Sequence, residues 1–407
     1  MNQFERIGIE VERQWRRVSY DEARFPTIAI SALRRAKIPA RTSPADVLDW
    51  VLGDAALPAQ HDVKSEFGDP PITVFRSSRF FIAVLFWNDG TTAIHEHGFS
   101  GAFQVLSGSS VHGVYSFKSD MRVSATFALG ALKPKHIELL RRGDIRPIVA
   151  GQGLIHSLFH LDRPSTSIVI RTTQDADQPS QFEYQPPDVG YASFAEDERS
   201  KRRIEALGAM RALSERHYFR ALAAQARTME LPLLFHALVR HYRDGDLDAM
   251  RPALAAARAR YGKAVDRILA AVLEQRRAHW IIRLRRSARD PELRFFLAVM
   301  LNARSRRAVV SLLRERFPRK NPAALIITWL DAIAELPPSD ARHDNALEIP
   351  YGDHSARIVE LVLADRPFRA IVRALSRDFG DVAEQQADLR AIYRDLKAHP
   401  LLAAWWR

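Results

Sequence analysis

The sequence of 407 residues contains no cysteine. Disulfide bonds, thiolate metal ligands and cysteine nucleophiles are therefore excluded, and any metal ion must be held by His, Asp or Glu. No run of eighteen apolar residues occurs, so no transmembrane helix is predicted. The first residues, MNQFERIGIEVERQWRR, lack the apolar core of a signal peptide, which predicts a cytoplasmic protein. Glycine-rich phosphate loops, serine nucleophile elbows and zinc-protease helix motifs are also missing.

Positive charge is concentrated in the second half of the chain. The net charge of the whole chain is +12. Residues 1–200 hold 22 Lys and Arg against 24 Asp and Glu, a balance of −2, whereas residues 201–407 hold 38 against 24, a balance of +14. Such a basic half could attract nucleic acid. Its arginines are scattered over amphipathic helices without a basic run that interleaves with aromatics, so the sequence argues against a nucleic-acid partner.

The chain divides into segments that differ in composition and in the spacing of their apolar residues. Residues 1–60 are predicted to be helical, with Ser43, Pro44 and Asp46 at one helix start in an arrangement close to a capping box. Between about residues 70 and 172, short runs rich in β-branched and aromatic residues are separated by turn residues, which is typical of an all-β barrel or sandwich. These runs are ITVF, RFFIAVLFW, GAFQVLSG, SVHGVYSF, RVSATFAL and STSIVIRT.

A polar, proline-rich linker follows, and from about residue 196 apolar residues recur at helical spacing to the end. The predicted fold class is therefore α+β with two domains. A β-barrel domain with N-terminal helices spans residues 1–195, and an all-α helical domain spans residues 196–407. Successive helix pairs are also compatible with an α-solenoid, although no fixed period establishes one.

Two histidines stand one residue apart in the stretch TTAIHEHGFSGAFQVLSG, residues 91–108. Residues i and i+2 of a strand share a face, so His95 and His97 point the same way and Glu96 points the opposite way. The segment GQGLIHSLFH supplies His156, three residues after Gly153 and near the start of another strand. The three imidazoles are predicted to bind one metal ion.

These residues resemble the motifs of the cupin superfamily. The matching residues are His95, His97, Gly108, Gly153, His156 and His160. The glutamate ligand of the first cupin motif is missing, because Gly101 and Ala102 occupy its place. A set of three histidines without a carboxylate is similar to the cysteine dioxygenase (thiol dioxygenase) branch. The resemblance covers roughly residues 72 to 172 and implies a double-stranded β-helix that binds Fe(II) and O₂.

The resemblance also implies roles for other side chains. An arginine upstream of the His-x-His binds the substrate carboxylate in this branch, and Arg76 is the nearest match; an exposed turn arginine is the competing interpretation. Arg171 falls where the branch has a tyrosine. Its side chain could project into the cavity and bind an anion as a second clamp, or it could lie outside the barrel. His160 is predicted to be a hydrogen-bonding residue of the site rather than a ligand. His112 is interpreted as structural or exposed.

Three hypotheses of function follow. The first is a mononuclear non-haem Fe(II)-dependent dioxygenase that acts on a small carboxylate-bearing substrate, amino-acid-like or thiol-like. The second is a non-catalytic metal- or metabolite-binding cupin whose basic helical domain binds a partner. The third is a cupin isomerase or lyase with another divalent metal. The absent tyrosine favours the latter two, and the intact histidine set favours the first. The helical domain could recognise a carrier or protein partner, or mediate homodimerisation.

Overall fold

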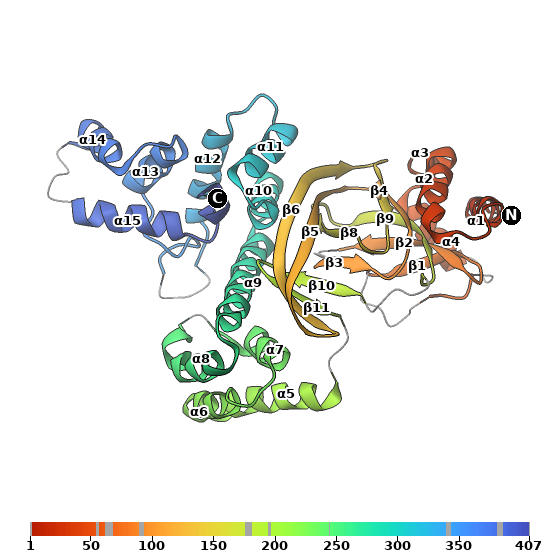
Figure 1. Ribbon diagram of the computed structural model, residues 1–407. Helices are drawn as coiled ribbons and strands as arrows, with labels where there is room; N and C mark the ends of the chain where they lie inside the picture. Colours follow the sequence, from red (N-terminus) through yellow and green to blue (C-terminus); the bar gives the residue numbers. More distant parts are fainter. Residues whose placement is uncertain are drawn as a thin grey trace. The chain divides into compact units, whose positions relative to one another are not determined.

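The computed structural model confirms the predicted fold class. N-terminal helices precede a β-region that contains a closed barrel, and a long helical region follows (Figure 1). The structure describes residues 2–53, 57–61, 68–88, 93–175, 181–193, 197–243, 245–338, 343–380 and 386–406. No helix in these ranges combines the length and the apolar character that are needed to cross a membrane.

The N-terminal helices begin at well-formed caps. Asn2 and Glu5 form a reciprocal capping box at the start of α1. The predicted capping at the start of α4 is confirmed, because the Asp46 amide donates to Ser43 Oγ (3.2 Å) and the Ser43 amide donates to Asp46 Oδ2 (2.7 Å). The helices are α1 (Gln3–Arg16), α2 (Phe25–Ala36), α3 (Ile38–Arg41) and α4 (Pro44–Gly53).

The strands form two sheets. A five-stranded sheet has the order β1-β2-β9-β4-β7, and a closed barrel has the order β10-β11-β6-β5-β8-β3. The strands are β1 (Pro71–Arg76), β2 (Phe80–Trp87), β3 (Ile94–His97), β4 (Gly101–Ser107), β5 (Ser109–Ser124), β6 (Phe127–Arg141), β7 (Ile145–Ile148), β8 (Gly151–His160), β9 (Ser165–Thr172), β10 (Phe182–Gln185) and β11 (Val189–Ala192).

Two separate apolar layers fill this β-region. The six barrel strands together contribute one buried cluster, which is therefore the barrel interior: Ile94, Tyr115, Phe117, Ala128, Ile155, Phe182, Tyr184 and Ala192. A second cluster joins β2, β4, β7 and β9 of the five-stranded sheet to Leu140 and Leu158 of the barrel strands. Because side chains alternate along a strand, the residues next to Ile94 and Ile155 in sequence face this second layer, between the two sheets.

The N-terminal helices cover the other face of the five-stranded sheet. In α1, Phe4, Ile7, Val11 and Trp15 form one buried stripe at helical spacing. This stripe packs in one cluster with apolar side chains of β1, β2, β4 and β9. The five-stranded sheet is thus buried on both faces, which explains why all eight residues of β2 are buried.

The first helices of the helical region share a core with the barrel. Phe127 and Leu129 of β6 and Val189 of β11 belong to one buried cluster with residues from α5 to α9. Arg267 of α9 adds ion pairs to Asp120 (2.7 Å) and Asp188 (3.3 Å). The helices concerned are α5 (Glu198–Leu213), α6 (Glu215–Gln225), α7 (Leu231–His241), α8 (Leu247–Tyr261) and α9 (Ala264–Ser287).

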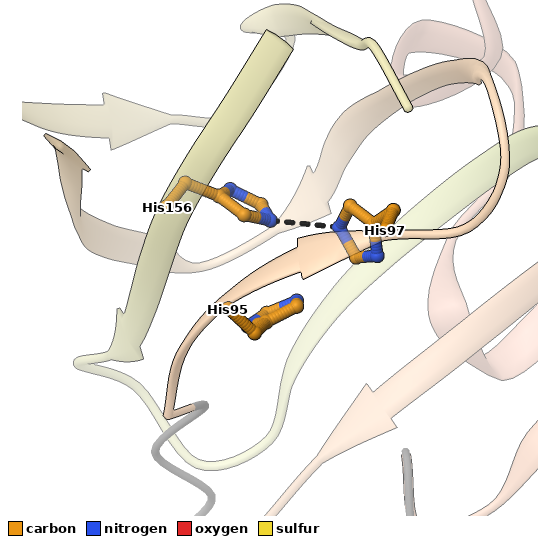
Figure 2. Close-up of side chains that lie close together, drawn as sticks. All are labelled: His95, His97 and His156. Atoms are coloured by element: carbon orange, nitrogen blue, oxygen red, sulfur yellow. Dashed lines mark hydrogen bonds between the residues drawn. The ribbon is translucent and has the colours of Figure 1, made fainter. Parts of the chain in front are cut away.

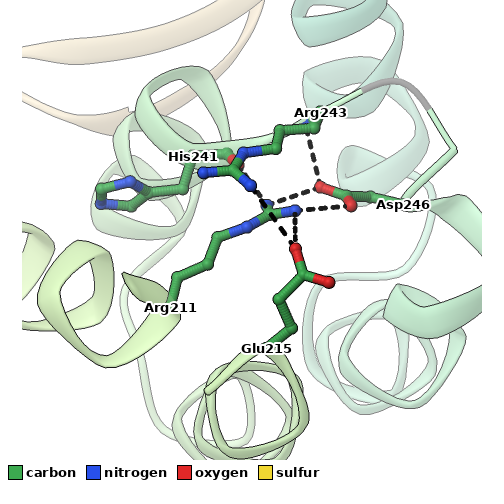
Figure 3. A network of polar contacts seen from close by, with 5 residues as sticks. All are labelled: Arg211, Glu215, His241, Arg243 and Asp246. Carbon is green, nitrogen blue, oxygen red and sulfur yellow. Dashed lines mark hydrogen bonds and ion pairs between the residues drawn. The ribbon is translucent and has the colours of Figure 1, made fainter. Parts of the chain in front are cut away.

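A buried ion pair ties these helices to one another (Figure 3). Both terminal nitrogens of Arg211 donate to the two oxygens of Asp246, at 2.7 and 2.8 Å. Arg211 also donates to the His241 carbonyl oxygen (2.5 Å) and to Glu215 (3.1 Å). The Arg243 amide donates to Asp246 as well (2.7 Å). The guanidinium is buried, so this network fixes the end of α5, the start of α6 and the end of α7 against the start of α8.

The last helices have a core of their own. Phe296 and Trp329 stack with ring centroids 5.0 Å apart. The buried His399 ring donates from Nε2 to the Leu347 carbonyl oxygen (2.8 Å) and accepts the Leu401 amide at Nδ1 (3.3 Å). The helices are α10 (Pro291–Asn302), α11 (Arg306–Arg316), α12 (Pro322–Ala334), α13 (Asp353–Leu363), α14 (Phe368–Phe379) and α15 (Gln386–Ala398).

By its contacts the chain forms two compact units. One contains Met1–His136 and Leu140–Arg276, and the other contains Ile137–Leu139 and Arg277–Arg407. The prediction of a linker over residues 174–200 is wrong in part, because β10 and β11 lie within this stretch and complete the closed barrel. The change from strand to helix falls between Ala192 and Glu198. The division into domains 1–195 and 196–407 stays a prediction.

Candidate metal centre

Strand register brings the three predicted histidines together. His95 of β3 lies opposite His156 of β8 in the antiparallel ladder, and the register shifts between His95 and His97. A register shift within a strand pair re-aims the side chains beside it. Figure 2 shows the three rings turned toward a common space between β3 and β8. The histidines occupy the barrel face that looks toward the five-stranded sheet, because Ile94 and Ile155 occupy the barrel interior.

The distances fit one ion. The ring centroids are 4.5 Å apart for His95 and His97, 4.8 Å for His95 and His156, and 5.0 Å for His97 and His156. One ring nitrogen from each lies within 4.8 Å of the others, and His97 Nε2 is 2.9 Å from His156 Nε2. Two nitrogens bonded to one metal at about 2.1 Å are roughly 3.0 Å apart at a right angle. This pair therefore has the spacing of neighbouring ligands, and the triad could hold a metal ion.

Burial favours the neutral form of these imidazoles. All three side chains are buried. Burial lowers the pKa of His95, and it lowers the pKa values of His97 and His156 well below the usual 6.5, with help from the neighbouring rings. A neutral imidazole keeps a lone pair for a metal. His95 Nδ1 lies 2.8 Å from the Ala93 carbonyl oxygen and donates to it, which leaves Nε2 as the ligand atom.

His112 is a site residue that the sequence did not reveal. It was interpreted as structural or exposed, but the structure places it on β5 in full burial, with Nε2 at 3.1 Å from His156 Nδ1. On the ladder His156 lies opposite Val114, so His112 is a diagonal neighbour on the same face. In the direction in which His156 Nδ1 donates to His112 Nε2, this hydrogen bond leaves His156 Nε2 as the atom that offers a lone pair to a metal.

Glu96 faces the opposite side, as the alternation predicted. Tyr184 of β10 donates a hydrogen bond to Glu96 Oε2 at 2.6 Å, inside the barrel. Burial raises the pKa of Glu96, and the tyrosine hydrogen bond partly offsets this rise. The only carboxylate of β3 is therefore bound elsewhere, and the donor set of the triad consists of imidazoles.

A cavity of about 210 Å³ adjoins the triad. Its walls come from both sheets, and they are mainly apolar and aromatic. The residues that line it are His61, Pro71, Thr73, Phe81, Ala83, Leu85, Trp87, His95, His97, Phe99, Phe103, Ile148, His156, Leu158, Ser167, Val169, Arg171 and Gln181. A concave apolar site with a few convergent polar groups is the usual form of a small-molecule site.

Arg171 lies in this cavity, whereas Arg76 does not. Arg171 shares a face of β9 with Ser167 and Val169, all three of which line the cavity. Arg76 is exposed at the end of β1, and Nη1 donates to the carbonyl oxygens of Ala59 and Gln60 (both 3.4 Å). The role of Arg76 as a carboxylate anchor stays a prediction that this position does not support.

His160 lies apart from the triad. Its ring stacks on Trp87 at 4.5 Å, and Nδ1 is 3.0 Å from Ser110 Oγ. It does not appear among the described residues that line the cavity, although Trp87 does. His160 thus has a hydrogen-bonding position behind a cavity wall, and its part in catalysis stays a prediction.

Comparison with known proteins adds a fold likeness. No protein-family model matches the chain, and no curated protein matches it. Solved structures that it resembles include hydroquinone 1,2-dioxygenase from Sphingomonas sp. TTNP3 with 4-hydroxybenzoate bound (13% identity, 26% of this chain and 68% of that one, TM-score 0.21). A cupin-2 domain protein from Shewanella frigidimarina matches at 14% identity over 26% of this chain and 83% of that one, with a TM-score of 0.18. A Klebsiella pneumoniae protein with a double-stranded β-helix domain matches at 17% identity over 29% and 93%, with a TM-score of 0.19. The likeness concerns under a third of this chain, and the fold described above rests on the strand order of the chain itself.

Proposed function

We propose that the protein is a mononuclear non-haem Fe(II)-dependent dioxygenase of the three-histidine type, which oxidises a small carboxylate-bearing substrate with O₂. The observation that carries the proposal is the convergence of His95, His97 and His156, all buried, beside a cavity that contains Arg171. Imidazole ligands suit iron among other first-row metals.

The histidines would hold the ion, and the other residues would serve the substrate. Bound Fe(II) supplies open coordination positions and electrons for the activation of O₂. Three neutral ligands leave its double positive charge uncompensated, which favours an anionic substrate in the same cavity. Arg171 binds the anionic end, and the apolar walls keep bulk water from the reacting groups. His112 holds His156 in the orientation and tautomer needed.

Metal analysis of protein purified without chelator tests the proposal. We expect about one equivalent of iron per chain and a large loss of iron in His95→Ala. His217→Ala is the matched control, because His217 is exposed on α6. Retention of the metal by His95→Ala would refute the site. An oxygen electrode then records O₂ uptake when small carboxylic acids are added, and iron-loaded protein that consumes no O₂ with any of them would contradict the dioxygenase assignment.

A further inference from the structure

The walls of the cavity are built for an apolar molecule. Phe81, Leu85 and Trp87 of β2 and Phe103 of β4 line it from the five-stranded sheet, and Leu158 of β8 lines it from the barrel. These side chains belong to the buried cluster between the two sheets. Trp87 Nε1 is already bonded to Ser167 Oγ at 3.1 Å, so the indole presents carbon atoms to the cavity. A ligand gains most of its affinity here from apolar surface that leaves water.

One positive charge is fixed within these walls. The Arg171 guanidinium carbon lies 3.2 Å from the centroid of the Phe99 ring and 4.9 Å from that of Phe81. Nε and Nη2 donate to the carbonyl oxygens of Thr172 (3.1 Å) and Thr173 (3.0 Å). These contacts hold the guanidinium in place before any ligand binds, so little conformational entropy is lost on binding.

The arginine and the triad are a short distance apart. Both contact Phe99, whose ring also lies 4.4 Å from the His97 ring, centroid to centroid. The guanidinium carbon is therefore at most 7.6 Å from the centre of the His97 ring (3.2 Å plus 4.4 Å). A small acid can reach both. The charge of Arg171 is also one cause of the lowered His97 pKa.

The described lining offers nothing for a second, cationic group. None of the described residues that line the cavity is Asp or Glu. Glu183 of β10 lies opposite His95 on the strand ladder, but it accepts hydrogen bonds from Tyr191 (2.9 Å) and Ser193 (3.0 Å) and does not line the cavity. Glu96 is held by Tyr184 on the opposite face of β3. An ammonium group in this cavity would lie among apolar side chains and near the positive charge of Arg171. Burial of a cation without a counter-charge is strongly unfavourable.

We infer that the cavity binds a monocarboxylate with an apolar, aryl or branched alkyl body and no charged amino group, with Arg171 as its carboxylate anchor. This inference rests on the proposed function and narrows its substrate class, since it sets aside zwitterionic amino acids. The carboxylate pairs with the guanidinium, and the body lies against Phe81, Leu85 and Trp87. The carbon atoms between the two ends then lie beside the triad.

Isothermal titration calorimetry with a matched set of probes tests the inference on the protein as purified. The probes are 3-phenylpropionate, its neutral analogue 3-phenylpropionamide, and L-phenylalanine, which adds an ammonium group to the same skeleton. We expect the acid to bind about 10- to 100-fold more tightly than the amide, as a charged hydrogen-bonded pair provides. The amino acid should bind more weakly than the acid. Benzoate and hexanoate test the shape of the apolar body.

Variants test whether Arg171 is the residue that binds the carboxylate. Arg171→Gln should remove the preference for acid over amide, and Arg171→Lys should restore part of it, because the charge returns without the planar fork. Arg79→Gln is the matched control, since the exposed Arg79 also stacks over an aromatic ring, that of Tyr20 at 4.4 Å, but lies outside the cavity lining. The thermal unfolding of each variant shows whether it is folded.

Several results would overturn the inference. They are equal affinity for acid and amide, tighter binding of L-phenylalanine than of 3-phenylpropionate, no binding of any acid at millimolar concentration, or loss of acid binding in Arg76→Gln with retention in Arg171→Gln. The metal content of each sample is measured separately. Protein without iron that still prefers the acid would support the ligand class and contradict the dioxygenase proposal, so the two failures can be told apart.

Discussion

Replacement of His112 by phenylalanine should weaken metal binding without removing a ligand. The hydrogen bond between His112 Nε2 and His156 Nδ1 is 3.1 Å long, and both side chains are 2% exposed or less. Phenylalanine leaves the Nδ1–H of His156 buried without an acceptor, which costs about 1–3 kcal/mol. That cost applies to the tautomer in which Nε2 binds the ion. At about 1.4 kcal/mol per tenfold change, the affinity should fall roughly 5- to 150-fold.

The assay is competition for Zn²⁺ or Co²⁺ with a chromophoric chelator at neutral pH. His112→Gln should recover most of the affinity, because its amide can still accept a hydrogen bond. His160→Phe is the matched control, since His160 is equally buried but stacks on Trp87 and bonds to Ser110 rather than to the triad. Equal metal affinities for wild type and a folded His112→Phe protein would refute the reasoning.

Three further outcomes are expected. Arg211→Met should destabilise the protein by about 3–5 kcal/mol in urea unfolding, because it leaves Asp246 charged and buried. Arg251→Met is the control: it breaks an exposed pair with Asp248 and should cost at most about 1 kcal/mol. Similar losses of stability in both variants would contradict this reasoning. Zn²⁺ at a hundred times its dissociation constant should stabilise the protein by about 2.7 kcal/mol, and a stabilised His95→Ala protein would argue against the triad. Burial lowers the pKa of His399 from 6.5, so the unfolded chain takes up the proton first as the pH falls. Stability should therefore be lost from about pH 6.5 down to that lowered pKa. NMR should show the neutral ring at pH 6.5, and an imidazolium there would refute the point.

Strand alternation predicted the local part of the site. The order His95, Glu96, His97 defines two faces without any knowledge of the neighbouring strands, and the structure shows those two faces. The cap at Ser43 and Asp46 was predictable for a similar reason, because its partners lie three residues apart. Such features depend on short stretches of backbone whose geometry is fixed.

Features that depend on strand pairing could not be predicted in this way. His112 is recognisable as a partner of His156 only once β5 is known to lie beside β8 in a particular register. The same limit applies to the arginines. Arg76 and Arg171 are the same type of residue, so the sequence does not show which of them lines the cavity. That becomes clear only when β9, which carries Arg171, is placed in the middle of the five-stranded sheet.

The packing of α5 to α9 on the barrel was likewise hidden from the sequence. Helical periodicity shows that each helix has an apolar face, but not what covers it. In the structure Phe127 of β6 lies 5.6 Å from Phe235 of α7, ring to ring, and Tyr191 of β11 lies 5.7 Å from the same ring. The spacing of apolar residues in α7 does not show whether its apolar face packs on a barrel strand or on another helix.

The four residues of β3 contribute side chains to two different buried spaces. His95 and His97 serve the space between the sheets, and Glu96 serves the barrel through Tyr184. If β3 slipped by one position along β8, the Glu96 carboxylate would point into the space between the sheets. The two imidazoles of β3 would then point into the packing around Ile94 and Phe117. The segment is therefore intolerant of any inserted or deleted residue, and substitutions at its odd and even positions should impair different properties, ion binding in the one case and barrel integrity in the other.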